Sequence, residues 1–182
     1  QQPTMISYAI TDPSTLDLNH LERDLKRFTQ KASMIVYRDK SSTSRHDADF
    51  VKAAKVFDFE KVLIHGDPAL ANSVGADGVH LSSLQLGKIA EAKAMDLFVV
   101  VSTHTKEELK NAELLGADMA TFSPVFDTPN KGLPVGLEML KTATSQVKIP
   151  VLALGGILTQ EQIRACEIAG ASGFASIRYF GD

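Results

Sequence analysis

The sequence predicts an α/β fold in which eight parallel strands close into a short (β/α)₈ or TIM barrel, without the helix that usually follows the last strand. Short apolar runs recur along the chain, helical patterns separate most of them, and one helix-end motif occurs three times. The chain has 182 residues, of which 44% are hydrophobic, enough for one core. We therefore expect residues 1–182 to form a single domain.

Eight apolar runs are expected to form the strands, because a parallel sheet covered by helices on its outside exposes neither face to water. The runs are Ile6–Ile10, Met34–Tyr37, Val62–Ile64, Gly78–Leu81, Leu97–Val101, Met119–Phe122, Pro150–Leu154 and Gly173–Ile177. The chain is shorter than the usual barrel of about 200 residues or more. An open, doubly wound sheet of the flavodoxin type is therefore the alternative.

Helical patterns lie between most of the runs. Leu18, Leu21 and Leu25 share one face of a helix, and Thr105 followed by Glu108 predicts a capping box at the start of another. Two further helices are expected after Pro134 and over residues 160–169. The segments Val74–His80, Leu115–Thr121 and Ala169–Ala175 repeat one design, in which a glycine ends a helix and the chain turns directly into a strand.

Composition argues against several classes of function. The formal net charge is −3, tryptophan is absent and aromatic residues make up 7%, so neither a basic surface nor stacking platforms for nucleic acid are expected. No apolar run approaches the roughly 20 residues that span a bilayer, and no secretory signal is recognisable. Cys166, the single cysteine, is interpreted as a buried helix residue rather than a catalytic thiol. We expect a cytoplasmic protein without nucleic-acid or membrane partners.

The candidate site lies at the carboxyl ends of the predicted strands, where barrels of this kind bind phosphate. Gly155 and Gly156 end the seventh strand, where backbone N–H groups could approach an anion, although such pairs also form simple tight turns. Arg38 and Lys40, one residue apart, would point to the same side at the end of the second strand. Lys131 lies in a long loop after the sixth strand, and Arg178 follows the eighth. These groups predict a phosphorylated small molecule as the ligand; the alternative is a set of solvated charges.

Several motifs, in order and at matching intervals, resemble the thiamine phosphate synthase and TenI family. They are Tyr8–Asp12, Tyr37–Lys40, Gly75–Leu81, Val101–Thr105, Ser123–Thr128 and Gly155–Ile157. The resemblance implies a TIM barrel and a transferase of thiamine biosynthesis. It would couple a pyrimidine methyl diphosphate to a thiazole phosphate, with release of pyrophosphate through a pyrimidine carbocation.

The resemblance also assigns roles to individual residues. It implies that Arg38 and Lys40 contact the diphosphate together with Ser102, and that Lys131 corresponds to a further catalytic lysine in the loop after the sixth strand. It also implies that Thr128 and the Gly156 backbone hold the thiazole phosphate. Further substrate-binding positions are Gly155, Ile177, Asn130 in place of a threonine, and Arg178 in place of a serine. His65 stands at the position of an asparagine, where it could hydrogen-bond the pyrimidine or act as a base.

The sequence also departs from the family pattern. The family implies Mg²⁺, but Gly66 and Gln85 stand where its two metal-binding aspartates are expected, and only Asp67 is a weak substitute. Pro124 occupies the position of the catalytic histidine of the TenI branch, and Val36 replaces a glutamine. The alternative function is therefore a diverged barrel that binds a phosphorylated thiamine-related ligand for salvage or regulation. A third possibility is another phosphorylated substrate. The missing last helix predicts an uncovered apolar flank and hence a homo-oligomer.

Overall fold

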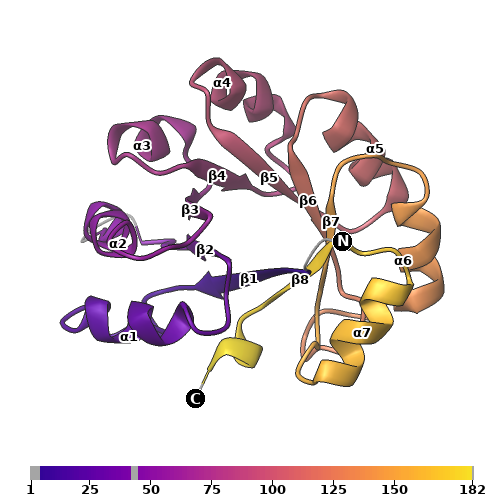
Figure 1. Cartoon of the computed structure of the whole chain (residues 1–182). Coiled ribbons are helices and arrows are strands. Elements are labelled where there is room, and N and C mark those ends of the chain that lie inside the picture. The colour runs from indigo at the N-terminus through magenta and orange to yellow at the C-terminus, as the bar shows by residue number, and fades with distance from the viewer. Residues whose placement is uncertain (1–4, 42–44, 182) are drawn as a thin grey trace.

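The computed structural model describes residues 5–41 and 45–181. Eight parallel strands form a closed barrel in the order β1 to β8, and the helices surround it (Figure 1). The ring closes because β8 pairs with β1, from Ile6 opposite Gly173 to Ala9 opposite Ser176. This confirms the predicted barrel and excludes the open sheet, in which the edge strands would not meet.

The strands are β1 (Ile6–Thr11), β2 (Met34–Tyr37), β3 (Lys61–His65), β4 (Gly78–Leu81), β5 (Phe98–Thr103), β6 (Met119–Phe122), β7 (Val151–Leu154) and β8 (Gly173–Ser176). The α-helices are α1 (Leu21–Phe28), α2 (Asp47–Ala54), α3 (Pro68–Ser73), α4 (Ile89–Ala94), α5 (Lys106–Leu114), α6 (Gly136–Thr144) and α7 (Gln160–Ile168). Two 3₁₀ turns are η1 (Leu86–Lys88) and η2 (Arg178–Phe180). Every predicted strand is present; the first helix begins at Leu21, later than its leucine pattern.

The hydrophobic core has two parts, because successive residues of a strand point to opposite sides of the barrel wall. A smaller cluster fills the barrel interior, and a larger one lies between the strands and the helices. The interior cluster contains Tyr8, Met34, Val36, Leu63, Val100, Met119, Leu152 and Ala175. Burial on both faces explains why the strands read as continuous apolar runs.

The repeated helix-end motif forms the predicted glycine turns, and in two of its three copies an aspartate makes further contacts. Gly75, Gly116 and Gly170 have φ of +79°, +104° and +103°, a left-handed conformation that favours glycine. Asp118, two residues after Gly116, accepts a hydrogen bond from Val99 N at 2.8 Å and pairs with Lys93 at 2.7 Å. Asp77 forms the corresponding contacts with Val62 N and Lys55. These two aspartates therefore anchor the start of the preceding strand.

Within the described residues β8 is followed by the η2 turn and not by an α-helix. This segment lies between α1 and α7 (Figure 1), and its Phe180 is 3% exposed. Phe180 stacks on Phe174 at 5.7 Å between ring centres and also contacts Phe28. The expectation of a bare flank is thus wrong at this place, because η2 covers it with aromatic side chains. A homo-oligomer stays a prediction.

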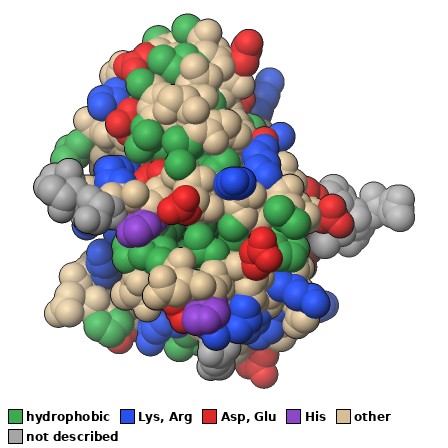
Figure 2. All heavy atoms as spheres, turned by 90° about the vertical axis from the view of Figure 1, so that its left-hand side faces the viewer, with side chains coloured by type: hydrophobic (Ala, Val, Ile, Leu, Met, Phe, Trp, Pro, Cys, Tyr) green, Lys and Arg blue, Asp and Glu red, His purple; other side chains and the backbone are tan. Residues whose placement is uncertain are grey.

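The outer surface mixes charges of both signs. Figure 2 shows acidic and basic side chains interspersed, with apolar groups between them, over the face that carries α2 and α3. No helix among the described residues is long and apolar enough to cross a membrane.

Candidate active site

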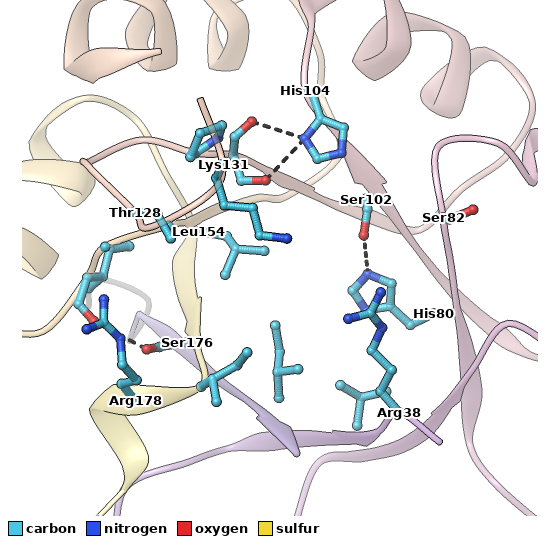
Figure 3. A pocket seen from close by; sticks show the side chains of 18 of the residues that line it. Arg38, His80, Ser82, Ser102, His104, Thr128, Lys131, Leu154, Ser176 and Arg178 are labelled. Carbon is cyan, nitrogen blue, oxygen red and sulfur yellow. Dashed lines mark hydrogen bonds between the residues drawn. The ribbon is translucent and has the colours of Figure 1, made fainter. Parts of the chain in front are cut away.

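A cavity of about 610 Å³ opens at the carboxyl ends of the strands (Figure 3). Its walls come from residues at or just beyond the ends of β2 to β8, and from Ile10 of β1. Nine of the eleven predicted catalytic and substrate-binding residues line it: Arg38, His65, Ser102, Thr128, Lys131, Gly155, Gly156, Ile177 and Arg178. The structure therefore brings most of the predicted site together.

The other predicted residues do not line the cavity. Lys40 and Asn130 are exposed, and Asn130 has a φ of +63° in the loop after β6. Asp67 caps α3, where its carboxylate accepts a hydrogen bond from Leu70 N at 3.0 Å. Roles for Lys40 and Asn130 in ligand binding stay predictions, and Asp67 has a structural use that accounts for its position.

The two glycines after β7 allow the loops after β6 and β7 to touch. A Cβ atom on Gly155 would lie 2.7 Å from Pro124 Cα, and one on Gly156 would lie 2.5 Å from the backbone oxygen of Asp127. Both glycines also have positive φ, +111° and +69°. Any larger residue would push the loop after β7 away from the loop after β6, which carries Thr128 and Lys131, so the turn determines the shape of this end of the cavity.

The charge that faces the cavity is positive. Arg38, Lys131 and Arg178 approach it from different sides (Figure 3). The buried Nε atom of Arg38 has no hydrogen-bond partner within the described part of the chain. None of the described residues that line the cavity is an aspartate or a glutamate. Such a surface favours an anion that accepts hydrogen bonds, because a buried donor without a partner is costly.

A chain of three polar side chains crosses the cavity floor from β1 to β5. Tyr8 Oη lies 2.8 Å from His80 Nδ1, and His80 Nε2 lies 2.8 Å from Ser102 Oγ. Burial, followed by the nearby His65 and Arg38, lowers the pKa of His80 to about 3. His80 is therefore neutral near pH 7, with one donor and one acceptor nitrogen, and it orients the Ser102 hydroxyl. No pattern in the sequence predicted that His80 links Tyr8 to Ser102.

His65 lies beside His80, with 5.7 Å between ring centres. Its pKa is lowered to about 4, first by burial and then by the positive charges of Arg38, Lys40 and Arg45. A histidine with so low a pKa is a weak base near neutral pH. Of the two predicted roles, the structure therefore favours a neutral hydrogen-bonding group over a base.

Sequence reasoning missed several polar groups of the cavity. Ser82 and Ser83 follow β4, and Ser123 follows β6. The Nδ1 atom of His104, at the rim of the cavity, lies 3.1 Å from the backbone oxygen of Ser123. Their position just after strand ends was the available signal, but serine is too common in loops for that signal to single them out.

The residues present do not fit a magnesium ion. Gly66 and Gln85 occupy the two expected ligand positions, and the Gln85 side chain donates from Nε2 to the Gly66 backbone oxygen at 2.9 Å. Its Oε1 accepts from Ser82 N at 3.0 Å. No group of three or more His, Cys, Asp or Glu that could hold a metal occurs among the described residues. Mg²⁺ prefers carboxylate oxygens, which are missing here.

Comparison with known proteins connects this cavity to a family. The family model described as "Thiamine monophosphate synthase" matches residues 7–180. A protein of Aquifex aeolicus named "Putative thiamine-phosphate synthase 2" is 36% identical over 95% of this chain and 96% of its own length. The thiamine-phosphate synthase of Syntrophomonas wolfei is 31% identical over 93% and 85%.

A solved structure agrees with these sequence matches. Thiamine phosphate pyrophosphorylase from Pyrococcus furiosus superimposes with a TM-score of 0.79 at 28% identity, covering 95% of this chain and 85% of that one. The match in sequence and fold runs through nearly the whole described barrel. The chain therefore belongs to the thiamine monophosphate synthase family.

Proposed function

We propose that this protein is a transferase that couples a pyrimidine methyl diphosphate to a thiazole phosphate, forming thiamine phosphate and pyrophosphate. The observation that carries the proposal is the convergence of Arg38, Lys131 and the Gly155–Gly156 turn on one cavity without carboxylates. Family membership supplies the reaction class. The partners proposed are these two small phosphorylated molecules.

The cavity divides into two regions that suit the two substrates. Arg38 and Ser102 lie at the ends of β2 and β5, on the side of His65 and His80, and we assign the diphosphate and the pyrimidine to this side. Thr128 and Gly156 lie on the side of the loops after β6 and β7, which we assign to the thiazole phosphate. Lys131, from the loop after β6, extends into the space between these two regions (Figure 3).

The proposed reaction breaks the bond between the methylene carbon and the diphosphate oxygen, and the electron pair leaves with the diphosphate. The thiazole nitrogen then forms a bond to the methylene carbon. The residues of this chain contribute by holding the leaving diphosphate, whose charge grows as the bond breaks. No proton needs to move between the substrates, which agrees with a neutral His65 and the absence of a strong base from its position.

An assay with both phosphorylated precursors tests the proposal directly. We expect thiamine phosphate to form above the uncatalysed background, detected by chromatography. Lys131→Ala should lower kcat/KM by about ten- to a hundredfold, because a charge-assisted hydrogen bond contributes roughly 1.5–3 kcal/mol. Lys110→Ala, an exposed position on α5, is the matched control and should leave the rate unchanged.

The second candidate is a protein that binds a phosphorylated thiamine-related ligand without turnover, which the missing carboxylates at positions 66 and 85 would favour. A thermal-shift measurement with thiazole phosphate and thiamine phosphate separates the two. Ligand at about 100 times its Kd should add roughly 2.7 kcal/mol of stability. Stabilisation without product formation would contradict the synthase proposal and support the binding protein.

We also propose a cytoplasmic location. The single cysteine supports it: Cys166 is a free thiol, buried in α7, and burial raises its pKa to about 11. Such a thiol is unreactive and takes part in no disulfide.

A further inference from the structure

The loops after β3 and β4 are held together by one neutral side chain. Gln85 reaches from the β4 loop to the backbone oxygen of Gly66, while its own Oε1 accepts from Ser82 N. A Cβ atom on Gly66 would lie 3.9 Å from both polar atoms of the Gln85 amide. The two positions at which the family resemblance expects metal-binding carboxylates are therefore in direct contact.

The Gln85 amide is suited to this bridge in a way that a carboxylate is not. Its NH₂ group donates to a carbonyl oxygen and its C=O group accepts from an N–H, so both ends are satisfied. A carboxylate can only accept, and its contact with the Gly66 oxygen would be repulsive unless a cation lay between them. Gly66 also has a φ of +83°, a left-handed conformation that favours glycine over residues with a Cβ atom. The bridge thus links the two loops without a cation.

The cavity next to this bridge already carries the charge that an organic diphosphate requires. Arg38, Lys131 and Arg178 are among its lining residues, and none of the described lining residues is acidic. A divalent cation would meet like charges and no carboxylate ligand. The unpartnered Nε donor of Arg38 remains available for an oxygen of the ligand.

We propose that this cavity binds the organic diphosphate as the free anion and not as its magnesium complex, with Gln85 as the positioning residue that replaces the metal bridge between the β3 and β4 loops. The inference rests on the proposed function, since it concerns the same site. The inference goes beyond the proposed function because it states the ionic form in which the substrate binds.

Calorimetric titration with inorganic pyrophosphate tests the inference without requiring turnover. We expect the full chain to bind pyrophosphate in EDTA, and excess Mg²⁺ to weaken the apparent affinity because it removes the free anion. Binding that requires Mg²⁺ would overturn the inference, and so would no binding in either buffer. The synthase assay, run in the same two buffers, keeps the questions separate: product formed only with Mg²⁺ overturns this inference and leaves the proposed function standing.

Gln85→Glu, compared with Gln146→Glu, tests the role of the amide. Gln146 is exposed after α6, at the opposite end of the barrel, so its variant controls for the added charge. In EDTA, Gln85→Glu should weaken pyrophosphate binding by about tenfold or more, the effect of one unfavourable charge contact. Added Mg²⁺ should reduce that deficit, whereas Gln146→Glu should bind like the unmodified chain in both buffers.

The sign of the Mg²⁺ response is the decisive readout, because a merely structural role of Gln85 would not produce it. Circular dichroism establishes that the variant is folded. Unchanged affinity of a folded Gln85→Glu variant in EDTA would contradict the assigned role. If that variant does not fold, the titration of the unmodified chain in the two buffers still decides the question.

Discussion

Arg38 and Lys40 leave the same strand end and reach different surroundings. The alternation of side chains along an extended chain predicted that both face the cavity. However, β2 ends at Tyr37, and Asp39 then forms a turn in which its carboxylate accepts from Tyr37 Oη at 3.1 Å and from Ser41 N at 2.9 Å. The alternation stops where the turn begins, so only Arg38 lines the cavity.

This difference gives a prediction for two single substitutions. Arg38→Ala should weaken pyrophosphate binding by about ten- to a hundredfold, since it removes a partly buried charge-assisted contact. Lys40→Ala should have a smaller effect that fades at high salt, because an exposed charge is screened. Titration at low and high salt checks both. A larger, salt-resistant loss for Lys40→Ala would show that Lys40 lies in the occupied site.

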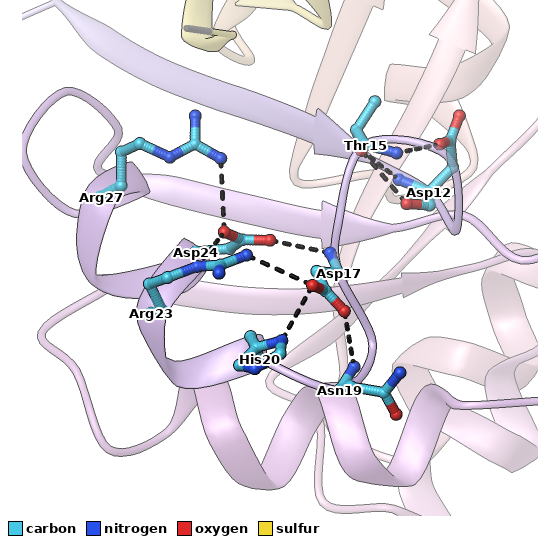
Figure 4. A network of polar contacts seen from close by, with 8 residues as sticks. All are labelled: Asp12, Thr15, Asp17, Asn19, His20, Arg23, Asp24 and Arg27. Atoms are coloured by element: carbon cyan, nitrogen blue, oxygen red, sulfur yellow. Dashed lines mark hydrogen bonds and ion pairs between the residues drawn. The ribbon is translucent and has the colours of Figure 1, made fainter.

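At the scale of single elements, polar side chains determine where helices begin. Figure 4 shows the segment before α1, where Asp17 N donates to Asp24 Oδ2 at 2.8 Å and Asp17 accepts from Asn19 N at 3.0 Å. These contacts hold the chain in a turn until Leu21. Leu18 therefore precedes the helix although its spacing matches the helical pattern.

The helices α5 and α7, which are capped by threonines, show the same effect. Thr105 caps α5 as predicted, but Glu108 accepts from His104 N at 2.7 Å, one residue earlier than in the reciprocal capping box. The complete box is at α7, between Thr159 and Gln162. Gln162 also donates to the Gly156 backbone oxygen at 2.9 Å, which ties the start of α7 to the glycine turn.

Gln162 belongs both to the capping box of α7 and to the contact with Gly156, so two substitutions can separate an effect on stability from an effect on ligand binding. Thr159→Ala should lower the free energy of unfolding by about 1 kcal/mol, as expected for a lost N-cap, and leave the affinity for thiazole phosphate unchanged. Gln162→Ala should lower both, because it also releases the Gly156 carbonyl. Urea unfolding and titration measure the two quantities. Equal binding by both variants would show that the glycine turn keeps its shape without this contact.

At the scale of the whole molecule, the buried histidines link stability to pH. His65 and His80 have a pKa near 4 and 3 in the fold, against 6.5 when exposed. As the pH falls below 6.5 the unfolded chain binds protons that the folded chain does not. Stability should therefore be highest above pH 6.5 and fall continuously towards pH 4.

Urea unfolding across this pH range measures the effect. The loss should be on the order of a few kcal/mol, mostly from the fully enclosed His80, and His80→Gln should reduce the slope. Carboxylates whose pKa is lowered in the fold, such as Asp17, change stability mainly below their ordinary pKa of 3.8. The pH dependence of stability between 6.5 and 4 therefore comes mainly from the histidines. A flat profile between pH 6.5 and 4 would contradict burial of neutral imidazoles.

The sequence by itself determined the barrel and most of the site. Each strand is buried on both faces, so each can be recognised in the sequence as a local apolar run. Each left-handed helix end favours a glycine at a fixed place, which marks where the next strand begins. Since all strands of the barrel are parallel, residues after their carboxyl ends must gather at one end. Local pattern was therefore enough to predict that Arg38, Lys131 and Gly156 share a cavity, and the family resemblance added Thr128.

Only the tertiary structure decided which side chains touch. Tyr8, His80 and Ser102 come from strands 72 and 22 residues apart, and no local pattern fixes their separation. The same holds for Gln85, which bonds Gly66 across 19 residues, and for Phe180, which covers the flank expected to be bare. Hydrogen bonds and packing need atoms placed to within fractions of an ångström, and that placement arises only when the ring of strands closes.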